Sequence, residues 1–219
     1  MKDVRLYSYW RSSASWRVRI GLQLKGLKYE YMPVHLIQDG GQQHSAEYRA
    51  VNPMRTLPTL EWTDDSGTLR RLSQSLPILE YLQACLPSPA LLPADPYLQA
   101  RSRMLAELVN SGIQPLQNLS VLQRIKNELK GDDKVWGAYW NARGLEAFEA
   151  AVKPTAGRYC VGDEVSLADI CLVPQLFGAR RFGVDLSPYP TVLRIEAACN
   201  ELPAFQAAHP DRQPDAAPA

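Results

Sequence analysis

The pattern of apolar and polar positions predicts a strand, a helix and a second strand at the start of the chain. Residues 4–9 and 27–36 are rich in β-branched and aromatic side chains, which is typical of strands. Residues 15–26 place apolar side chains both at alternate positions and four residues apart, and we interpret them as a helix. The residues suited to its ends are Ser13 or Ser15 as N-cap and Gly26 after the last turn.

A hairpin and another helix are predicted next. Residues 57–62 and 68–73 read as strands joined by the turn at 64–67, with Pro58 at the entry of the first strand. Residues 73–86 read as a helix, in which Ser73 or Ser75 serves as the cap and Pro77 lies in the first turn. The order β-α-β-β-β-α indicates an α/β domain over residues 1–86.

Proline-rich residues then separate this domain from a helical one. Residues 87–96 are predicted to be a linker, because prolines so closely spaced interrupt helices and sheets. Residues 97–219 are predicted to form an all-helical domain with a flexible tail from residue 209. Its helices are expected over 97–129, with a break near Gly112 and Pro115, over 136–152, and over 166–182, which opens with Ser166 and Asp169 spaced as a capping box.

Composition and charge narrow the class of protein. The chain has 219 residues, 46% of them hydrophobic and 21% charged, which is usual for a globular protein. A net charge of +1 gives no electrostatic case for nucleic acid or an acidic membrane as partner. No secretory signal or membrane-spanning run is seen, so we expect a cytoplasmic protein. The four cysteines form no C-x-x-C pair and none has metal-ligand spacing to histidine, which predicts buried thiols and no metal site.

Candidate chemistry lies in the serine-rich turn between the first strand and the first helix. Residues 9–15 carry no cysteine, which excludes dithiol chemistry at this turn. A serine nucleophile needs a base, and no histidine lies in this segment. We therefore expect the protein to bind a thiol and to stabilise its thiolate with a serine hydroxyl and a helix N-terminus. A second helix N-terminus, at Gln74 and Ser75, suits a carboxylate of the same guest, although both sites are also compatible with plain helix caps.

Several long motifs resemble zeta-class glutathione transferases. The resemblance extends over nearly the whole chain and implies a thioredoxin-like α/β N-terminal domain followed by an all-α C-terminal domain. It also implies glutathione as cofactor, a homodimer, and a dianionic small-molecule substrate. The motifs are YSYWRSSASWRVRIGLQLKG, NPMRTLPTL, QSLPILEYL, SGIQPLQNLSVL, YCVGDEVSLADICLVPQ and RRFGVDLSPYPT.

The resemblance also assigns site residues. Ser12, with Ser13 beside it, would hold and activate the glutathione thiol, while Arg181 and Arg11 would face the second substrate. Gln43 would contact the glycine end. The backbone of Leu57, before a cis Pro58, would pair with the cysteinyl amide, and Gln74 and Ser75 would bind the γ-glutamyl carboxylate. The remaining cofactor-binding candidates are Ala14, Ser15, Trp16 and Arg17 around the first turn, and Gln114, Asn118, Leu119 and Ser120 in the helical domain.

The implied reaction is the cis–trans isomerisation of maleylacetoacetate to fumarylacetoacetate in tyrosine and phenylalanine breakdown. The glutathione thiolate would add to the double bond, allow rotation and leave again. Three alternatives stay open: maleylpyruvate isomerisation in gentisate degradation, glutathione transfer or dehalogenation on small α-halo acids, and a module without catalysis. Ala14 stands where the family usually has cysteine, which bears on the choice of substrate.

Overall fold

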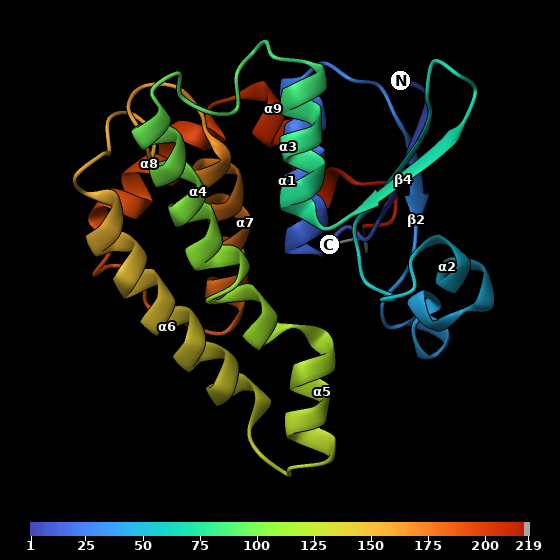
Figure 1. Ribbon diagram of the computed structural model, residues 1–219. Coiled ribbons are helices and arrows are strands. Elements are labelled where there is room, and N and C mark those ends of the chain that lie inside the picture. The colour runs from blue at the N-terminus through green and yellow to red at the C-terminus, as the bar shows by residue number, and fades with distance from the viewer. Residues whose placement is uncertain (217–219) are drawn as a thin grey trace. The chain divides into compact units, whose positions relative to one another are not determined.

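The computed structural model describes residues 1–216, and the chain divides into two compact units. The first unit combines Met1–Pro89 with the chain from Pro203 onward, and the second is Ala90–Leu202 (Figure 1). The change of unit after Pro89 falls inside the proline-rich segment expected to be the linker. The chain rejoins the first unit at Pro203, whereas residues 97–219 were expected to form one domain.

The first unit is built on a mixed sheet, as the sequence pattern predicts. Within residues 1–216 its strands are β1 (Lys2–Ser8), β2 (Glu30–Pro33), β3 (Thr59–Thr63) and β4 (Leu69–Ser73), in the order β2-β1-β3-β4. β1 and β2 are parallel and are joined through helix α1 (Ser13–Leu24), whereas β3 is antiparallel to both β1 and β4. β2 is shorter than the predicted strand at 27–36.

Two helices cover one face of this sheet. α1 and α3 (Ser75–Cys85) pack against each other and lie side by side in Figure 1. Gly21 permits their close approach, because a Cβ there would lie 2.2 Å from Cδ2 of Leu79. The core beneath them consists of Val4, Leu6, Leu60 and Trp62 from the sheet and Val18, Leu22, Ile78 and Leu82 from the helices.

The caps of these helices differ in part from the prediction. The N-cap of α1 is Ser12 rather than Ser13 or Ser15, and Gly26 follows the C-cap with a φ of +62°, as expected. The N-cap of α3 is Gln74, with a φ of +74° and no side-chain cap, rather than a serine. Ser75 is instead the first residue inside the helix, and its Oγ atom accepts a hydrogen bond from Nη1 of Arg17 at 3.2 Å.

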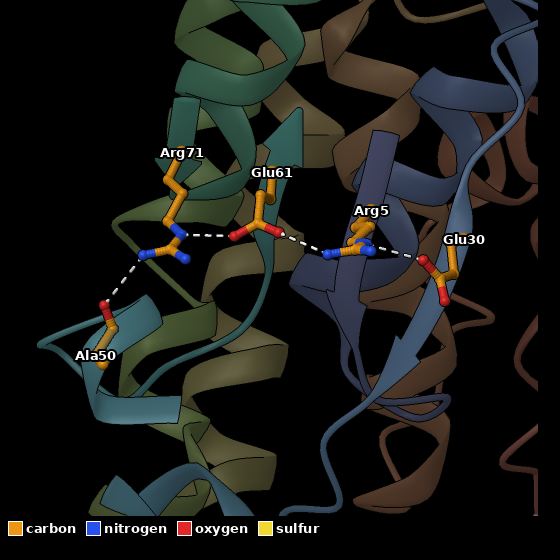
Figure 2. Close-up of polar contacts among 5 residues, drawn as sticks. All are labelled: Arg5, Glu30, Ala50, Glu61 and Arg71. Carbon is orange, nitrogen blue, oxygen red and sulfur yellow. Dashed lines mark hydrogen bonds and ion pairs between the residues drawn. The ribbon is translucent and has the colours of Figure 1, made fainter. Parts of the chain in front are cut away.

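The opposite face of the sheet carries charges of alternating sign. Arg71 of β4, Glu61 of β3, Arg5 of β1 and Glu30 of β2 are direct cross-strand neighbours and form a continuous row (Figure 2). Glu61 Oε2 lies 2.6 Å from Arg71 Nε, and Glu61 Oε1 lies 3.5 Å from Arg5 Nη1. Arg71 also donates from Nη1 to the carbonyl of Ala50 at 3.3 Å. Since Ala50 belongs to α2 (Ala46–Val51), the row ties this helix to the sheet.

The C-terminal segment is ordered against the first unit. α9 (Pro203–Ala208) packs on α1, and the ring of His209 stands edge-on to Trp16 at 5.2 Å between centroids. Gln213 Nε2 donates to the carbonyls of Ala207 and His209. The expected disorder from residue 209 is therefore not found up to residue 216, because hydrogen bonds and ring packing fix this stretch. The last residues of the predicted tail, 217–219, lie outside the described chain.

The second unit is helical, as predicted. α4 (Pro96–Asn110) is followed by the short 3-10 helix Gln114–Gln117, so the chain breaks where the sequence places Gly112 and Pro115. The helices that follow are α5 (Leu119–Asn127), α6 (Asp133–Val152), α7 (Leu167–Arg181) and α8 (Pro190–Asn200).

Helix α7 forms the centre of the second unit. Asp169 Oδ2 accepts the backbone N–H of Ser166 at 2.8 Å, which confirms the predicted capping box. α7 is buried along most of its length. Cys160, Cys171 and Cys199 are buried as expected, but Cys85 is exposed at the end of α3.

In the described chain, no helix has the length and apolar character needed to cross a membrane.

Candidate active site

The serine-rich turn forms the junction between β1 and α1. The N–H of Ser12 donates to the carbonyl of Tyr9 at 3.0 Å, which closes a turn around Trp10 and Arg11. Ser12 Oγ accepts the N–H of Ser15 at 3.2 Å and so caps the helix. A hydroxyl has one proton and two acceptor positions, and within residues 1–216 the Ser12 proton has no acceptor. Half-buried Ser12 can therefore cap α1 and still donate to a bound sulfur.

The first turn of α1 adds a favourable potential at this place. Ser13 and Ala14 are half-buried, and the N-terminal N–H groups of a helix carry partial positive charge that favours a thiolate. Ser15 is buried, and its Oγ has no partner in the described chain. Trp16 and Arg17 are also buried. The ring of Trp16 packs on His209 and Arg17 donates to Ser75, so both side chains have contacts within the first unit.

The bond from Arg17 to Ser75 joins the two helix ends that the sequence selects. Ser75 is the first residue of α3 and is buried, whereas Gln74 before it is exposed. The left-handed backbone of Gln74 turns the chain sharply into the helix. The first-turn N–H groups of α3 are donors without helical partners, which is the chemistry that a carboxylate requires.

The loop before β3 presents a free backbone edge. The Leu57–Pro58 peptide bond is cis, as expected. The carbonyl of Thr56 accepts from the Tyr48 hydroxyl at 2.7 Å and from Asn52 Nδ2 at 2.8 Å, which fixes the preceding peptide. The N–H and C=O of Leu57 have no partner among residues 1–216, so this residue can pair with an extended peptide.

Gln43 lies in a short 3-10 helix between β2 and α2 and is largely buried. Its Nε2 donates to the carbonyl of Leu36 at 3.4 Å, while its Oε1 is buried without a partner in the described chain. Gly41 makes room for this amide, since a Cβ there would lie 2.5 Å from Gln43 Nε2. The free amide oxygen suits a donor such as a peptide N–H.

The predicted residues of the second unit gather around the 3-10 helix and the start of α5. Asn118 caps α5 by accepting from the N–H and the hydroxyl of Ser120, at 3.1 and 3.0 Å. Gln114 and Leu119 are half-buried in the same stretch. The exposed Arg181 ends α7, and the neighbouring Arg180 forms a bidentate pair with Glu196.

A cavity of about 710 Å³ borders the serine turn within the first unit. Its lining includes Tyr9, Trp10 and Arg11 from the turn, His35 and Gln42 from the segment after β2, and Asp215. His35 Nδ1 accepts the N–H groups of Ile37 and Gln38, at 3.2 and 2.9 Å. No group of three or more His, Cys, Asp or Glu in residues 1–216 has the arrangement of a metal site.

Two family models match this chain. Residues 11–85 match the glutathione S-transferase N-terminal domain, and residues 140–203 match the glutathione S-transferase C-terminal domain. The maleylacetoacetate isomerase of Rattus norvegicus is 53% identical over 210 residues, which are 96% of this chain and 94% of the relative. This chain belongs to the glutathione S-transferase family.

Solved structures show which class of the glutathione S-transferase family this chain resembles. A maleylacetoacetate isomerase from Anaeromyxobacter dehalogenans 2CP-1, with bound GSH in its active site, has a TM-score of 0.90, 54% identity and 98% coverage of both chains. A maleylpyruvate isomerase described as a bacterial zeta-class glutathione S-transferase has a TM-score of 0.89 and 42% identity, and covers 97% of this chain and 100% of its own. The resemblance to the zeta class is thus confirmed.

Two residues of this glutathione S-transferase that bond to the serine-rich turn, but lie outside it in the sequence, were not predicted. Asp215 accepts the N–H of Trp10, and the buried Arg19 donates to the carbonyls of Tyr9 and Trp10. The sequence offered one indication for Arg19, which is a charged residue among the apolar positions of a predicted helix. Asp215 had none, because it lies in a polar, proline-containing stretch of the kind associated with disorder.

Proposed function

We propose that this protein is a glutathione-dependent cis–trans isomerase that converts maleylacetoacetate to fumarylacetoacetate. The observation that carries the proposal is the Ser12 hydroxyl, which caps α1 and keeps its proton available at the positive end of the helix. Maleylacetoacetate isomerases at 53% and 54% identity over nearly the whole chain support the same reaction.

The residues of the first unit fit glutathione. The tripeptide offers a thiol, a γ-glutamyl carboxylate, two peptide groups and a glycine carboxylate. Leu57 has an unpaired backbone edge for the cysteinyl amide, and buried Gln43 has an unpaired amide oxygen for a peptide N–H. The start of α3, at Gln74 and Ser75, would bind the γ-glutamyl carboxylate.

Bound glutathione supplies the thiolate that adds reversibly to the double bond. A free thiol with a pKa near 8.5 is only a few per cent ionised at pH 7. Ser12 would raise that fraction by donating a hydrogen bond to the sulfur, and the first N–H groups of α1, at Ser13 and Ala14, would add their partial charge. Arg11 and Arg181 would bind the carboxylates of the substrate, which is a dianion at pH 7.

Ala14 is the reason to consider maleylpyruvate as an alternative substrate. The resemblance implies a cysteine at this position in most zeta-class proteins, and its absence here is shared with some maleylpyruvate isomerases. That enzyme also occurs among the structural neighbours, at 42% identity. The maleyl group and the thiol chemistry are the same in both reactions, so the two substrates differ only in what the pocket must accommodate beyond the double bond.

We further propose a homodimer that works in the cytoplasm, in tyrosine and phenylalanine breakdown. In such a dimer Gln114, Asn118, Leu119 and Ser120 would complete the glutathione site from the helical unit or from the partner. Sedimentation of the purified protein at micromolar concentration tests the dimer, and a monomer with full activity contradicts it.

An ultraviolet assay of the purified enzyme tests the reaction. We expect turnover of maleylacetoacetate that requires glutathione and exceeds turnover of maleylpyruvate in kcat/KM. Faster use of maleylpyruvate would support the alternative substrate. Full-speed turnover of maleyl compounds in thiol-free buffer would contradict the proposed mechanism, because Ser12 is then not activating a borrowed thiol.

A further inference from the structure

The turn that presents Ser12 is held by two opposite charges. The N–H of Trp10 donates to Asp215 Oδ2 at 3.0 Å, and the carbonyl of Trp10 accepts from Arg19 Nη2 at 2.9 Å. Arg19 also donates to the carbonyl of Tyr9 at 3.3 Å. The peptide groups on either side of Trp10 are therefore fixed by a carboxylate and a guanidinium, and hydrogen bonds to charged groups are roughly twice as strong as neutral ones.

Asp215 is itself firmly anchored. Its other oxygen, Oδ1, accepts the hydroxyl of Tyr31 at 2.6 Å. Burial and the Asp215 hydrogen bond raise the pKa of Tyr31, so the phenol stays protonated as the donor. The segment that carries Asp215 is fixed in turn, because Arg19 Nε donates to the carbonyl of Ala208 at 3.1 Å and α9 packs on α1.

Arg19 supplies the positive side of the arrangement from the interior. It is fully buried on α1, and burial lowers its pKa to about 10, so it stays charged at neutral pH. Its hydrogen bonds go to neutral oxygens of Ser8, Tyr9, Trp10 and Ala208. The charge of Asp215 acts on Arg19 as well and favours its protonated form.

We propose that Asp215 is a positioning residue for thiol activation, acting through Trp10 on the orientation of the Ser12 hydroxyl. Only Arg11 separates Trp10 from Ser12, and the N–H of Ser12 closes the same turn onto Tyr9. A tilt of the Trp10 peptide would therefore displace Ser12. Displacement of a catalytic group by about 1 Å can cost about 100-fold in rate. The proposal rests on the proposed role of Ser12 toward glutathione.

A positioning role and a purely electrostatic role of Asp215 predict opposite changes in the pKa of the bound thiol, so the proposal can be tested by substitution. A carboxylate near the site would by itself disfavour a thiolate, so removing its charge would lower the pKa of the bound thiol. Loss of positioning would raise that pKa instead, because the Ser12 hydrogen bond weakens. Asp215→Ala removes the acceptor and the charge, whereas Asp215→Asn removes the charge and keeps an oxygen for the N–H of Trp10.

The experiment measures the pKa of enzyme-bound glutathione from thiolate absorbance, together with kcat and KM. For Asp215→Ala we expect a raised thiol pKa and a kcat lower by about 10- to 100-fold, with KM for glutathione changed less than kcat. Asp215→Asn should stay near the wild type in both. The control is Asp211→Asn, an exposed carboxylate four residues away that lies 3.6 Å from Nδ1 of His209, and it should match the wild type.

Three outcomes would overturn the positioning role. They are an unchanged thiol pKa and kcat in Asp215→Ala, a loss of thermal stability alone, and a thiol pKa lowered in both variants. A failure of the proposed function looks different, because the wild-type enzyme would then show no dependence on glutathione. If the wild-type enzyme depends on glutathione but substitution of Asp215 has no effect, only the positioning role is contradicted.

Discussion

Ser12 Oγ accepts the N–H of Ser15 at 3.2 Å, so the residue proposed to activate the thiol is also the N-cap of its helix. The cap uses a lone pair of the oxygen, and activation uses the proton. The two roles are compatible in one hydroxyl and separable by substitution.

Ser12→Ala removes both roles. We expect glutathione-dependent isomerisation to fall by at least about 100-fold, and the free energy of unfolding to fall by about 1 kcal/mol for the lost cap. Ser12→Asp keeps a capping acceptor without a proton to donate, so it should retain stability and lose activity. Steady-state kinetics and urea unfolding measure the two effects.

A second N-cap provides the control for Ser12. Asp95 caps α4 by accepting the N–H of Leu98 at 2.9 Å and is not among the proposed site residues. Asp95→Ala should lower stability and leave the pKa of the bound thiol unchanged. Unchanged turnover in Ser12→Ala would contradict the assignment of Ser12.

The charged row of Figure 2 leads to a prediction about α2. Arg71→Ala leaves Glu61, only 3% exposed, with its longer contact to Arg5, and it frees the carbonyl of Ala50. We expect a loss of about 2 kcal/mol, less than the 3–5 kcal/mol typical of broken buried pairs because Arg71 itself is partly exposed. The amides of α2 should also exchange faster with solvent deuterium.

Arg70 is the matched control, because it is the preceding residue on the same strand. Its partner is Asp64 in the hairpin turn, at 2.7 Å, and both are accessible to water. Arg70→Ala should therefore reduce stability only slightly and leave amide exchange in α2 unchanged. Equal losses in the two variants would show that the row does not hold α2.

How far the sequence predicts this fold depends on the distance between partners along the chain. The Ser166–Asp169 capping box was predictable because its partners are three residues apart. The start of α3 was not, because its N-cap is Gln74, which has a positive φ and no side-chain cap and so carries none of the usual capping signals. The contact of Trp10 with Asp215 spans 205 residues, and no local pattern encodes it.

Helix α1 shows why its pattern was ambiguous. Residues 15–22 are all buried, including Arg17 and Arg19, so the helix has no solvent-facing polar stripe in this stretch. The apolar residues then fit alternation as well as helical spacing. The residues at its ends favoured a helix over a strand, and the structure confirms Gly26 as the residue that follows the last turn.

Asn141 links three elements of the second unit through its amide. It donates from Nδ2 to Gln117 Oε1 and to the carbonyl of Gly137, both at 2.7 Å, and its Oδ1 accepts from Gln175 Nε2 at 2.6 Å. Asn141→Ala would leave the fully buried Gln175 amide without its partner. Since a buried unsatisfied group costs about 1–3 kcal/mol, we expect a loss of about 3 kcal/mol in urea unfolding.

Gln175→Leu should cost less than Asn141→Ala. The Oε1 atom of Gln175 already has no partner within residues 1–216, so leucine removes one unsatisfied oxygen while leaving Asn141 Oδ1 unpaired. Asn141 would keep its bonds to Gln117 and Gly137. A larger loss in Gln175→Leu than in Asn141→Ala would contradict Asn141 as the centre of this network.

His209 should make stability depend on pH. Burial lowers its pKa in the folded protein, Asp211 opposes the shift, and the positive charges of Arg19 and Arg212 add to it. Between the folded pKa and the ordinary value near 6.5, the unfolded chain binds more protons, so stability falls as pH falls through this window. Urea unfolding at pH 7.5 and pH 5 should therefore show a smaller loss in His209→Gln than in the wild type. The half-buried ring against Trp16 is the feature that disfavours the charged form. Equal losses in the two proteins would therefore mean that other groups cause the whole dependence on pH.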